Sequence, residues 1–291
     1  MKLVAVVLNW NGGEDTPRAL ASLDGIETIC VDNGSTDGSD LEVERRFPQI
    51  ELLRTGANLG YAGGNNVGIR RALERGADWV LLLNNDAEAE PGIAAALARA
   101  AAARPDAGIL ACKVLFEDGE TVQYAGASFN TWFGYSGRAV GYGERDRFYE
   151  LHDVARADGA AMAVLLAALD HGELATDLFA YVEDVELSLR LRRRGFAVVF
   201  VPDAVVRHRG SAATGGSAST HNLYYDTRNT IVVTERHRPL PPVLRGLRRA
   251  VIVGAHLVQA GMHQARGAAI GAVLEGWRDA RAGRMGQRSS R

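Results

Sequence analysis

Three groups of polar side chains in the N-terminal half have the residue types that bind phosphates and divalent cations. Each group directly follows an apolar run: NWNGG (9–13), DNGSTDGS (32–39) and NNDAE (84–88). Asp86 and Asn85 offer hard oxygen ligands, and a cation shared with a diphosphate needs only one or two carboxylates from the protein. The same residues also suit an acidic lead into a helix.

Two further stretches could contact a nucleotide. Asp32 ends a strand-like run and could accept hydrogen bonds from a nucleobase or a ribose, or could act only as a turn residue beside the Asn-Gly turn signal. Gly63, Gly64 and Asn65 lie in NLGYAGGNNVGI (58–69), before an amphipathic helix. Free N–H groups at a helix start favour phosphate, but no GxGxxG pattern is present, and an ordinary loop explains the glycines equally well.

The C-terminal half offers carboxylates and a histidine. Glu183 and Asp184 open the acidic stretch YVEDVELSLRLRRRG (181–195). Acids in the first turn of a helix and arginines in its last explain much of this pattern. They do not explain two adjacent acids after an aromatic run, and a carboxylate anchored there could act as a general base. His208 follows a strand-like stretch and is either a ligand or a structural histidine.

The elements that must position these residues follow an alternating pattern. Helical candidates at 15–22, 37–47, 66–75 and 91–103 separate apolar runs at 3–8, 28–31, 50–53, 79–83 and 107–112. Strands that are nearly all apolar, separated by helices, predict a parallel sheet covered on both faces. Ligands bind outside the carboxyl ends of such strands, which is where the three polar groups lie.

After Lys113 the rhythm changes. Residues 113–157 predict irregular or antiparallel structure, 160–169 and 181–195 predict helices, and 196–201 predicts a strand. A loop at 209–220 and a mainly helical region from His221 onward complete the expectation. We therefore predict an α/β fold with a helical C-terminal extension. The α/β domain is expected to span residues 1–234 in two halves, 1–112 and 113–234. The helical extension is expected to span residues 235–291.

Composition narrows the class of protein. Of 291 residues, 47% are hydrophobic and 23% charged, which is typical of a globular protein with a real core. Its two cysteines lie in apolar runs, which indicates buried thiols in a reducing compartment. Residues 235–291 hold eleven Arg and three acids, a charge of +8, so the remainder carries −10 within a total of −2. A basic tail on an acidic body predicts contact with something anionic.

Eight stretches in order resemble the family-2 glycosyltransferases of GT-A type, especially the bacterial rhamnosyltransferase-like branch. They span about residues 3–230: VVLNWNG, VDNGSTDGS, NLGYAGGNNVGI, LLLNNDAE, DGAAMAV, FAYVEDVELSLRLRRRGF, VPDAVVRHRGS and YYDTRN. The resemblance implies a GT-A fold and inverting transfer of a sugar from a nucleotide-diphosphate sugar (dTDP-rhamnose, a GDP-sugar or a UDP-sugar) to a glycan or a lipid-linked acceptor. It implies no nucleic-acid partner.

The resemblance also assigns roles. Asp184, beside Glu183, would be the catalytic base, and Asp86 would hold Mg²⁺ or Mn²⁺, with His208 as a second metal or diphosphate contact. The nucleotide-sugar contacts would be Asn9, Asp32, Gly63, Gly64, Asn65, Asn85 and Arg228, the last from the family's RN pair. Asn84 departs from the family pattern, because it stands where the usual Asp-x-Asp element has its first acid.

Two alternatives to this function remain open in the sequence. A nucleotidyltransferase would favour a basic phosphate-gripping loop near residues 10–18, where only Arg18 is basic. A non-catalytic sugar-nucleotide-binding relative would not need Asp86, Asp184 and His208 together.

The tail is expected either to make a peripheral contact with a membrane, or to pack on the body of the protein or on a second subunit as a homodimer interface. Its longest apolar stretch, 250–262, contains His256 and Gln259 and is shorter than the ~20 residues that span a bilayer. With no signal peptide visible, the expected location is cytoplasmic, with or without contact with the inner face of the cell membrane.

Overall fold

The computed structural model describes residues 1–169, 173–210 and 219–289. Ten of the described strands form one sheet, in the order β10-β12-β6-β11-β4-β1-β2-β3, with β5 beside β12 and β7 beside β6. The strands of this sheet are β1 (Leu3–Asn9), β2 (Glu27–Asp32), β3 (Glu51–Arg54), β4 (Trp79–Asn84), β5 (Ala87–Ala89), β6 (Ala107–Phe116), β7 (Val122–Tyr124), β10 (His152–Asp153), β11 (Ala161–Leu165) and β12 (Ala197–His208). Outside it, β8 (Phe129–Asn130) and β9 (Tyr135–Ser136) form a hairpin.

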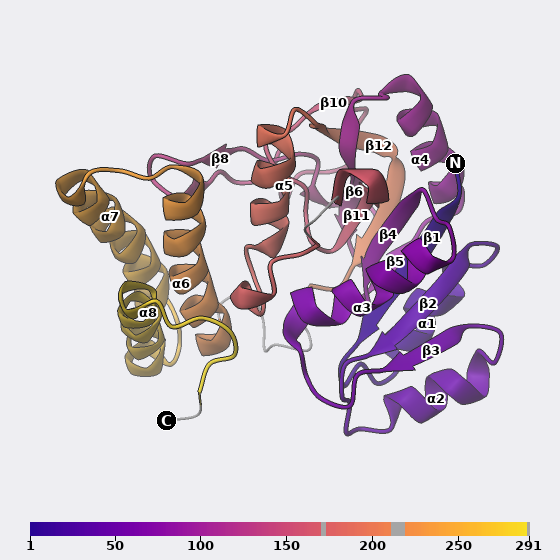
Figure 1. The fold of residues 1–291 in the computed structure, drawn as a ribbon, viewed down its shortest axis with the longest axis horizontal. Helices are drawn as coiled ribbons and strands as arrows, with labels where there is room; N and C mark the ends of the chain where they lie inside the picture. Colours follow the sequence, from indigo (N-terminus) through magenta and orange to yellow (C-terminus); the bar gives the residue numbers. More distant parts are fainter. Residues whose placement is uncertain (170–172, 211–218, 290–291) are drawn as a thin grey trace.

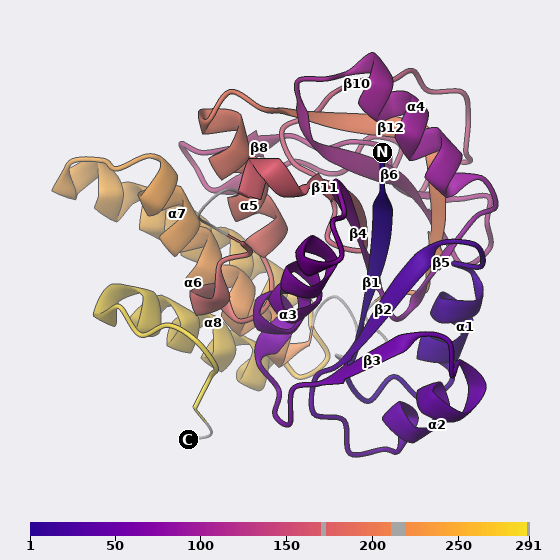
Figure 2. The same cartoon turned by 45° about the vertical axis from the view of Figure 1, so that its right-hand side comes forward.

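The N-terminal half has the predicted parallel arrangement. Strand β1 pairs in parallel with β2 and β4, and β2 pairs in parallel with β3. The apolar runs are the core, since Val4–Val7 and Val80–Leu82 are fully buried. The helices of this half are α1 (Asp15–Ala21), α2 (Ser39–Arg46), α3 (Gly60–Glu74) and α4 (Ile93–Ala103). Figure 2 shows α3 on one side of the sheet and α1 on the other, so both faces are covered.

One predicted element is wrong in type, and one predicted helix begins earlier than expected. Residues 160–169 form strand β11 and a short 3₁₀ turn, Leu166–Leu169, instead of a helix. The strand lies antiparallel between β4 and β6 at the centre of the sheet, where burial on all sides outweighs the helical preference of its alanines. Helix α3 begins at Gly60, six residues before the predicted start, so the glycine-rich stretch is helical.

The second half departs from the βα rhythm as expected, with short strands from β7 to β10. The predicted strand 196–201 continues to His208 as one long strand, β12, whose register with β6 shifts between Val201 and Val205. Helix α5 (Glu183–Arg193) matches the predicted acidic helix. The predicted loop 209–220 lies mostly outside the described residues, and Thr220 already begins a helix.

Three helices complete the chain: α6 (Thr220–His237), α7 (Pro242–Gly261) and α8 (Arg266–Ala282). Figure 1 shows them standing together beside the sheet, with α5 between. The predicted boundary at residue 235 falls inside α6, which packs against both α7 and α8. Among the described residues, no helix combines the length and hydropathy needed to cross a bilayer.

Candidate active site

A cavity of about 910 Å³ opens at the carboxyl ends of β1 and β4 and is bounded on its other side by α5, α6 and α7. Each of the three polar groups that follow strands contributes to its wall. Trp10 comes from the first group, Asn33 from the second, and Asn84, Asn85 and Asp86 from the third. The opposite wall carries Glu183 and Asp184, followed by aromatic and apolar side chains of α6, α7 and the β8–β9 hairpin.

Asp86 and His208 meet at one wall of this cavity although they lie 122 residues apart. Strand β5, which begins just after Asp86, pairs with the end of β12 and sets Ala87 opposite His208. The His208 Nε2 atom lies 3.1 Å from Asp86 Oδ1, and both side chains are 9% exposed. Burial disfavours the charged imidazole, but the hydrogen bond to Asp86 and its charge outweigh burial and raise the pKa of His208. A carboxylate and an imidazole are therefore held together at the cavity wall.

The His208 side chain has a second partner, which fixes the orientation of its ring. His208 Nδ1 lies 3.1 Å from Gln123 Oε1, so both ring nitrogens have a partner. If Nδ1 donates to the Gln123 oxygen, Nε2 of the neutral ring keeps a lone pair that can bind a cation, whereas in the protonated ring Nε2 donates to Asp86. Gln123 was not among the residues singled out from the sequence.

Glu183 and Asp184 open helix α5 and line the cavity. Gly159 N donates to Asp184 Oδ2 at 3.1 Å, and Val185 N donates to Oδ1 at 2.7 Å. Burial raises the pKa of Asp184 against the opposing charge of Arg156, whose Nη1 lies 3.9 Å away. A fixed carboxylate whose pKa is raised is well suited to accept a proton.

Glu183 is more isolated. Its Oε2 atom is buried without a hydrogen-bond partner among the described residues. Burial, together with the charge of Asp184, raises the pKa of Glu183 well above its ordinary value. The two adjacent carboxylates therefore differ, because both oxygens of Asp184 accept backbone hydrogen bonds, whereas Glu183 Oε2 has no partner among the described residues.

The structure adds cavity residues that the sequence did not single out. Asp226 of α6 lines the same wall, and burial and the charge of Asp184 raise its pKa to about 7. Arg156 and Asp158 also line the cavity. Asp226 stands two residues before the RN pair in YYDTRN, and no spacing in the sequence marked it as facing Glu183 and Asp184.

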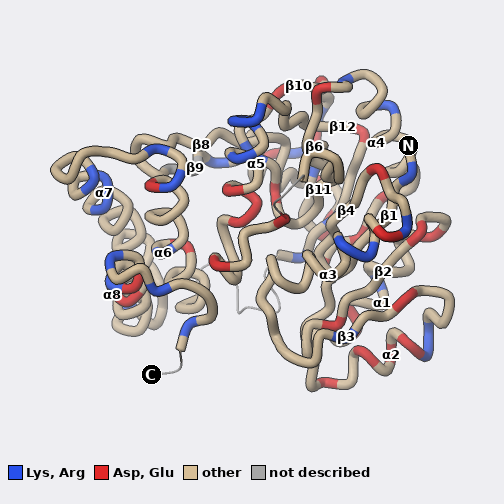
Figure 3. Tube along the Cα trace, viewed as in Figure 1, with Lys and Arg blue, Asp and Glu red and all other residues tan. Residues whose placement is uncertain are grey.

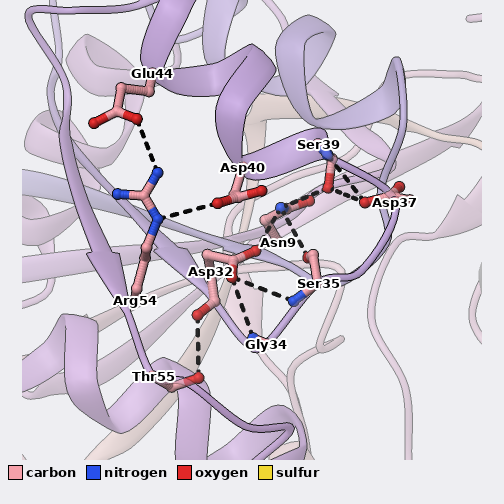
Figure 4. Close-up of polar contacts among 10 residues, drawn as sticks. All are labelled: Asn9, Asp32, Gly34, Ser35, Asp37, Ser39, Asp40, Glu44, Arg54 and Thr55. Atoms are coloured by element: carbon pink, nitrogen blue, oxygen red, sulfur yellow. Dashed lines mark hydrogen bonds and ion pairs between the residues drawn. The ribbon is translucent and has the colours of Figure 1, made fainter.

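Asn9 and Asp32 lie beneath the cavity and do not line it. Both are buried, and Asn9 Nδ2 donates to Asp32 Oδ1 at 2.9 Å (Figure 4). The same amide reaches the hydroxyls of Ser35 and Ser39, and Asp32 Oδ2 accepts from the N–H groups of Gly34 and Ser35, each at 3.2 Å. The pair thus braces the loop after β2, whose Asn33 lines the cavity.

Gly63, Gly64 and Asn65 lie in the first turns of α3 and away from the cavity wall. A Cβ atom on Gly64 would lie 2.3 Å from Leu8 Cδ1, so this glycine permits close packing of α3 on β1. Residues from the start of the same stretch, Asn58, Gly60 and Tyr61, line the cavity instead.

Arg228 is also away from the cavity wall. It is 1% exposed, and its guanidinium donates to the carbonyl oxygens of Leu178 and Gly286. The structure thus brings Asn85, Asp86, Glu183, Asp184 and His208 to the cavity and places the other predicted contacts behind its walls.

A family model described as glycosyl transferase family 2 matches residues 5–171, more than half of the chain. The chain belongs to this family. The matched range includes the three polar groups, of which the third contains Asp86. It ends before Glu183, Asp184 and His208.

Curated relatives agree with this membership. The chain is 29% identical over 274 residues to an N-acetylglucosaminyl-diphospho-decaprenol L-rhamnosyltransferase of Mycobacterium tuberculosis, covering 84% of this chain and 89% of that protein. It is 27% identical over 237 residues to the low-salt glycan biosynthesis hexosyltransferase Agl10 of Haloferax volcanii, covering 80% of this chain and 75% of that protein.

Solved structures share the fold. The mannosyltransferase PcManGT from Pyrobaculum calidifontis, in complex with GDP-Man and Mn²⁺, has a TM-score of 0.57 at 19% identity, over 97% of this chain and 75% of that one. S. aureus TarS has a TM-score of 0.57 at 14% identity, over 96% and 81%. The GT-A fold expected from the sequence is confirmed.

This family-2 glycosyltransferase is thus an enzyme of sugar transfer. The sequence alone had left two alternatives open, a nucleotidyltransferase and a non-catalytic relative. Arg18, the one basic residue between residues 10 and 18, lies on α1 and forms an ion pair with Asp15 of the same helix.

Proposed function

We propose that the chain transfers a sugar from a nucleotide-diphosphate sugar to a hydroxyl group with inversion at the anomeric carbon. The observation that carries this proposal is the placement of the Asp86–His208 pair and the Glu183–Asp184 pair on the walls of one cavity. The first pair suits the diphosphate end of a donor, and the second suits an acceptor hydroxyl.

A divalent cation, Mg²⁺ or Mn²⁺, fits beside Asp86 and His208. A carboxylate and an imidazole already meet there at 3.1 Å. The part of the chain that the structure describes contains no cluster of three or more His, Cys, Asp or Glu side chains suited to a metal. Such a site would need the donor diphosphate and water to complete it, which is how cations shared with phosphates are commonly held. When bound, the cation would neutralise charge on the diphosphate oxygens.

The chain's own residues supply the rest of the reaction. Asp184 takes the proton of the acceptor hydroxyl as the hydroxyl oxygen forms its bond to the anomeric carbon, and the bond from that carbon to the diphosphate breaks. Because the oxygen attacks opposite the leaving group, one displacement inverts the anomeric configuration. Glu183, whose raised pKa favours the neutral form, can donate a hydrogen bond to the acceptor sugar.

The nucleoside is proposed to lie at the end of the cavity lined by Trp10, Asn33 and Asn58. In this arrangement Asp32 and Asn9 support the nucleoside through the loop that they brace. Direct contact of Asp32 with the base, and contact of Arg228 with the donor, stay predictions. We propose dTDP-rhamnose as the first donor to test, because the mycobacterial relative is named an L-rhamnosyltransferase; GDP- and UDP-sugars follow.

The acceptor is proposed to be lipid-linked and reached from a membrane surface. The mycobacterial relative is named for a diphospho-decaprenol compound. In this chain the cavity wall beyond the acids includes the apolar side chains of Phe133, Val251 and Ile252, beside His256 and Gln259. On α7 this wall continues into an exposed apolar stripe, which consists of Val243, Leu247, Val251, Val258 and Met262 just past the helix end.

Charge on α7 favours a lipid surface over a second copy of the chain. No acidic residue occurs between Glu235 and Glu275, and Figure 3 shows α7 with arginines alone as charged residues. Of these arginines, Arg245 is exposed beside the apolar stripe, as suits the interface of an anionic membrane, whereas Arg248 is buried and Arg249 pairs with Glu235. A homodimer through the same helices is the alternative outcome.

Thermal shift with nucleotide sugars tests the proposal. A ligand that binds the native state raises the melting temperature, so the panel of dTDP-, GDP- and UDP-sugars, each with and without Mn²⁺, should contain one that does so in a metal-dependent way. The donor found should then be hydrolysed slowly or transferred. A panel without any shift or turnover would contradict the proposal.

A further inference from the structure

The segment that leads into α5 has a backbone that few side chains adopt. Phe179, Tyr181 and Val182 have φ angles of 66°, 66° and 72°. Phe179, with ψ of −61°, is the centre of a γ-turn closed by a hydrogen bond from Ala180 N to Leu178 O at 2.8 Å. A γ-turn of this hand is rare and strained. Such conformations persist at non-glycine residues only where the surroundings enforce them.

Two side chains of α6 supply that enforcement. Asn229 Nδ2 donates to three carbonyl oxygens of the segment, those of Leu178 at 3.0 Å and of Ala180 and Tyr181 at 2.8 Å. Arg228 Nη2 donates to Leu178 O at 2.8 Å, and Arg228 Nε donates to Asn229 Oδ1 at 2.9 Å. Both side chains are almost fully buried, so these bonds form away from solvent.

The chain beyond α8 closes the same cluster. Arg228 Nη1 donates to Gly286 O at 2.7 Å, and Gly286 N donates to Asp177 O at 2.7 Å. One guanidinium therefore links the segment before α5 to the C-terminal tail. Glu183 and Asp184 follow the segment directly, so the backbone held by this cluster sets where their side chains point.

We propose that Arg228, Asn229 and Gly286 form a positioning clamp that holds residues 178–182 in their strained conformation and thereby aims Glu183 and Asp184 into the cavity. The expected fall in kcat rests on the proposed function. The expected effect on the backbone of residues 178–182 rests on the hydrogen bonds alone. None of the three residues touches the cavity, so each is a positioning residue.

Substitution of Asn229 tests the clamp by kinetics. Asn229→Ala removes the donor to all three carbonyl oxygens, and a displacement of about 1 Å in a catalytic group typically costs ~10²-fold in rate. We expect kcat to fall by about this factor while donor affinity stays unchanged. Asn229→Asp should be at least as damaging, because a carboxylate only accepts hydrogen bonds. Thr234→Val is the matched control, since Thr234 is equally buried on α6 and bonds only within that helix.

Amide hydrogen exchange gives a second readout that does not depend on activity. In Asn229→Ala, the amides of Ala180 and Glu186, which bond to Leu178 O and Val182 O, should exchange faster than in the control. A truncation after Met285, which removes Gly286, should also speed exchange at these amides, but less, because the bonds to Leu178 remain. Only its exchange bears on the clamp, since it also removes Gln287 and Arg288 from the cavity wall. This truncation is the test on folded protein if Asn229→Ala does not fold.

Unchanged exchange at Ala180 and Glu186, or a kcat equal to that of Thr234→Val, would overturn the clamp. If the unmodified chain transfers no sugar from any donor, the proposed function fails, and the exchange measurement still decides the clamp.

Discussion

Replacing Asp184 with Asn removes the charge that should accept the acceptor's proton and leaves the size of the side chain nearly unchanged. In the structure Asp184 accepts from Gly159 N and Val185 N, and an Asn carbonyl oxygen can keep one of these bonds. We therefore expect α5 to stay in place. Loss of a general base typically costs ~10²–10⁴ in rate, which equals roughly 2.7–5.4 kcal/mol on the barrier at 1.36 kcal/mol per factor of ten.

The assay separates chemistry from binding. Single-turnover transfer from a labelled nucleotide sugar measures the chemical step, and calorimetry measures donor affinity, which should not change because the donor diphosphate is expected beside Asp86. Asp177→Asn is the control, because Asp177 pairs with Arg236 at 2.6 Å and does not line the cavity. Asp184→Asn with transfer as fast as this control would refute Asp184 as the base. A loss confined to donor affinity would refute the separation of the two ends of the cavity.

Three further predictions follow from the same geometry. Asp86→Ala should weaken donor binding in the presence of Mn²⁺ by at least the ~10–100-fold typical of a lost metal-ligand partner, with little effect in its absence. Asp226→Asn should raise the free energy of unfolding near pH 8 by at most about 4 kcal/mol, because the pKa of Asp226 rises from 3.8 to about 7 on folding and its ionisation opposes folding in that window. The gain should vanish below about pH 4 in urea titrations. Leu247→Glu should abolish flotation on anionic vesicles, as should removal of residues 240–291, whereas Leu73→Glu, at the same 60% exposure on α3, should not.

Each of these predictions has a contradictory outcome. If donor affinity in the presence of Mn²⁺ is equal in Asp86→Ala and in the unmodified chain, Asp86 is not part of the metal site. A stability difference for Asp226→Asn that is constant from pH 4 to pH 8 would mean that the carboxyl titrates normally. Flotation that survives Leu247→Glu, or a dimer that this substitution converts to a monomer, would show that α7 faces a partner other than lipid.

The parallel half of the fold could be predicted because its strands are short apolar runs that end in turn residues. Their length of four to six residues distinguishes these runs from buried helices. The strand ends then place Asn84, Asn85 and Asp86 at one edge. The same reasoning fails for 160–169, because alanine-rich text favours a helix locally and only the neighbouring strands β4 and β6 make it a strand. Local preference loses there to tertiary burial.

The candidate site could be predicted only where a side chain directly follows a strand or opens a helix. Asp86, Asp184 and His208 satisfy that condition and reach the cavity. Asp226 lies mid-helix, and its position opposite Glu183 depends on how α6 packs, which sequence spacing does not encode. Asn229 and Arg228 were visible as a motif, but the carbonyl oxygens that they bind belong to a strained segment some 50 residues earlier, which no local pattern reveals.

A crystal structure with an intact nucleotide sugar and Mn²⁺ tests the central claim most directly. The account predicts the diphosphate and the cation beside Asp86 and His208, the nucleoside between Trp10 and Asn58, and the anomeric carbon turned toward Asp184. A donor bound elsewhere on the protein, or bound in this cavity with its diphosphate remote from Asp86, would contradict it.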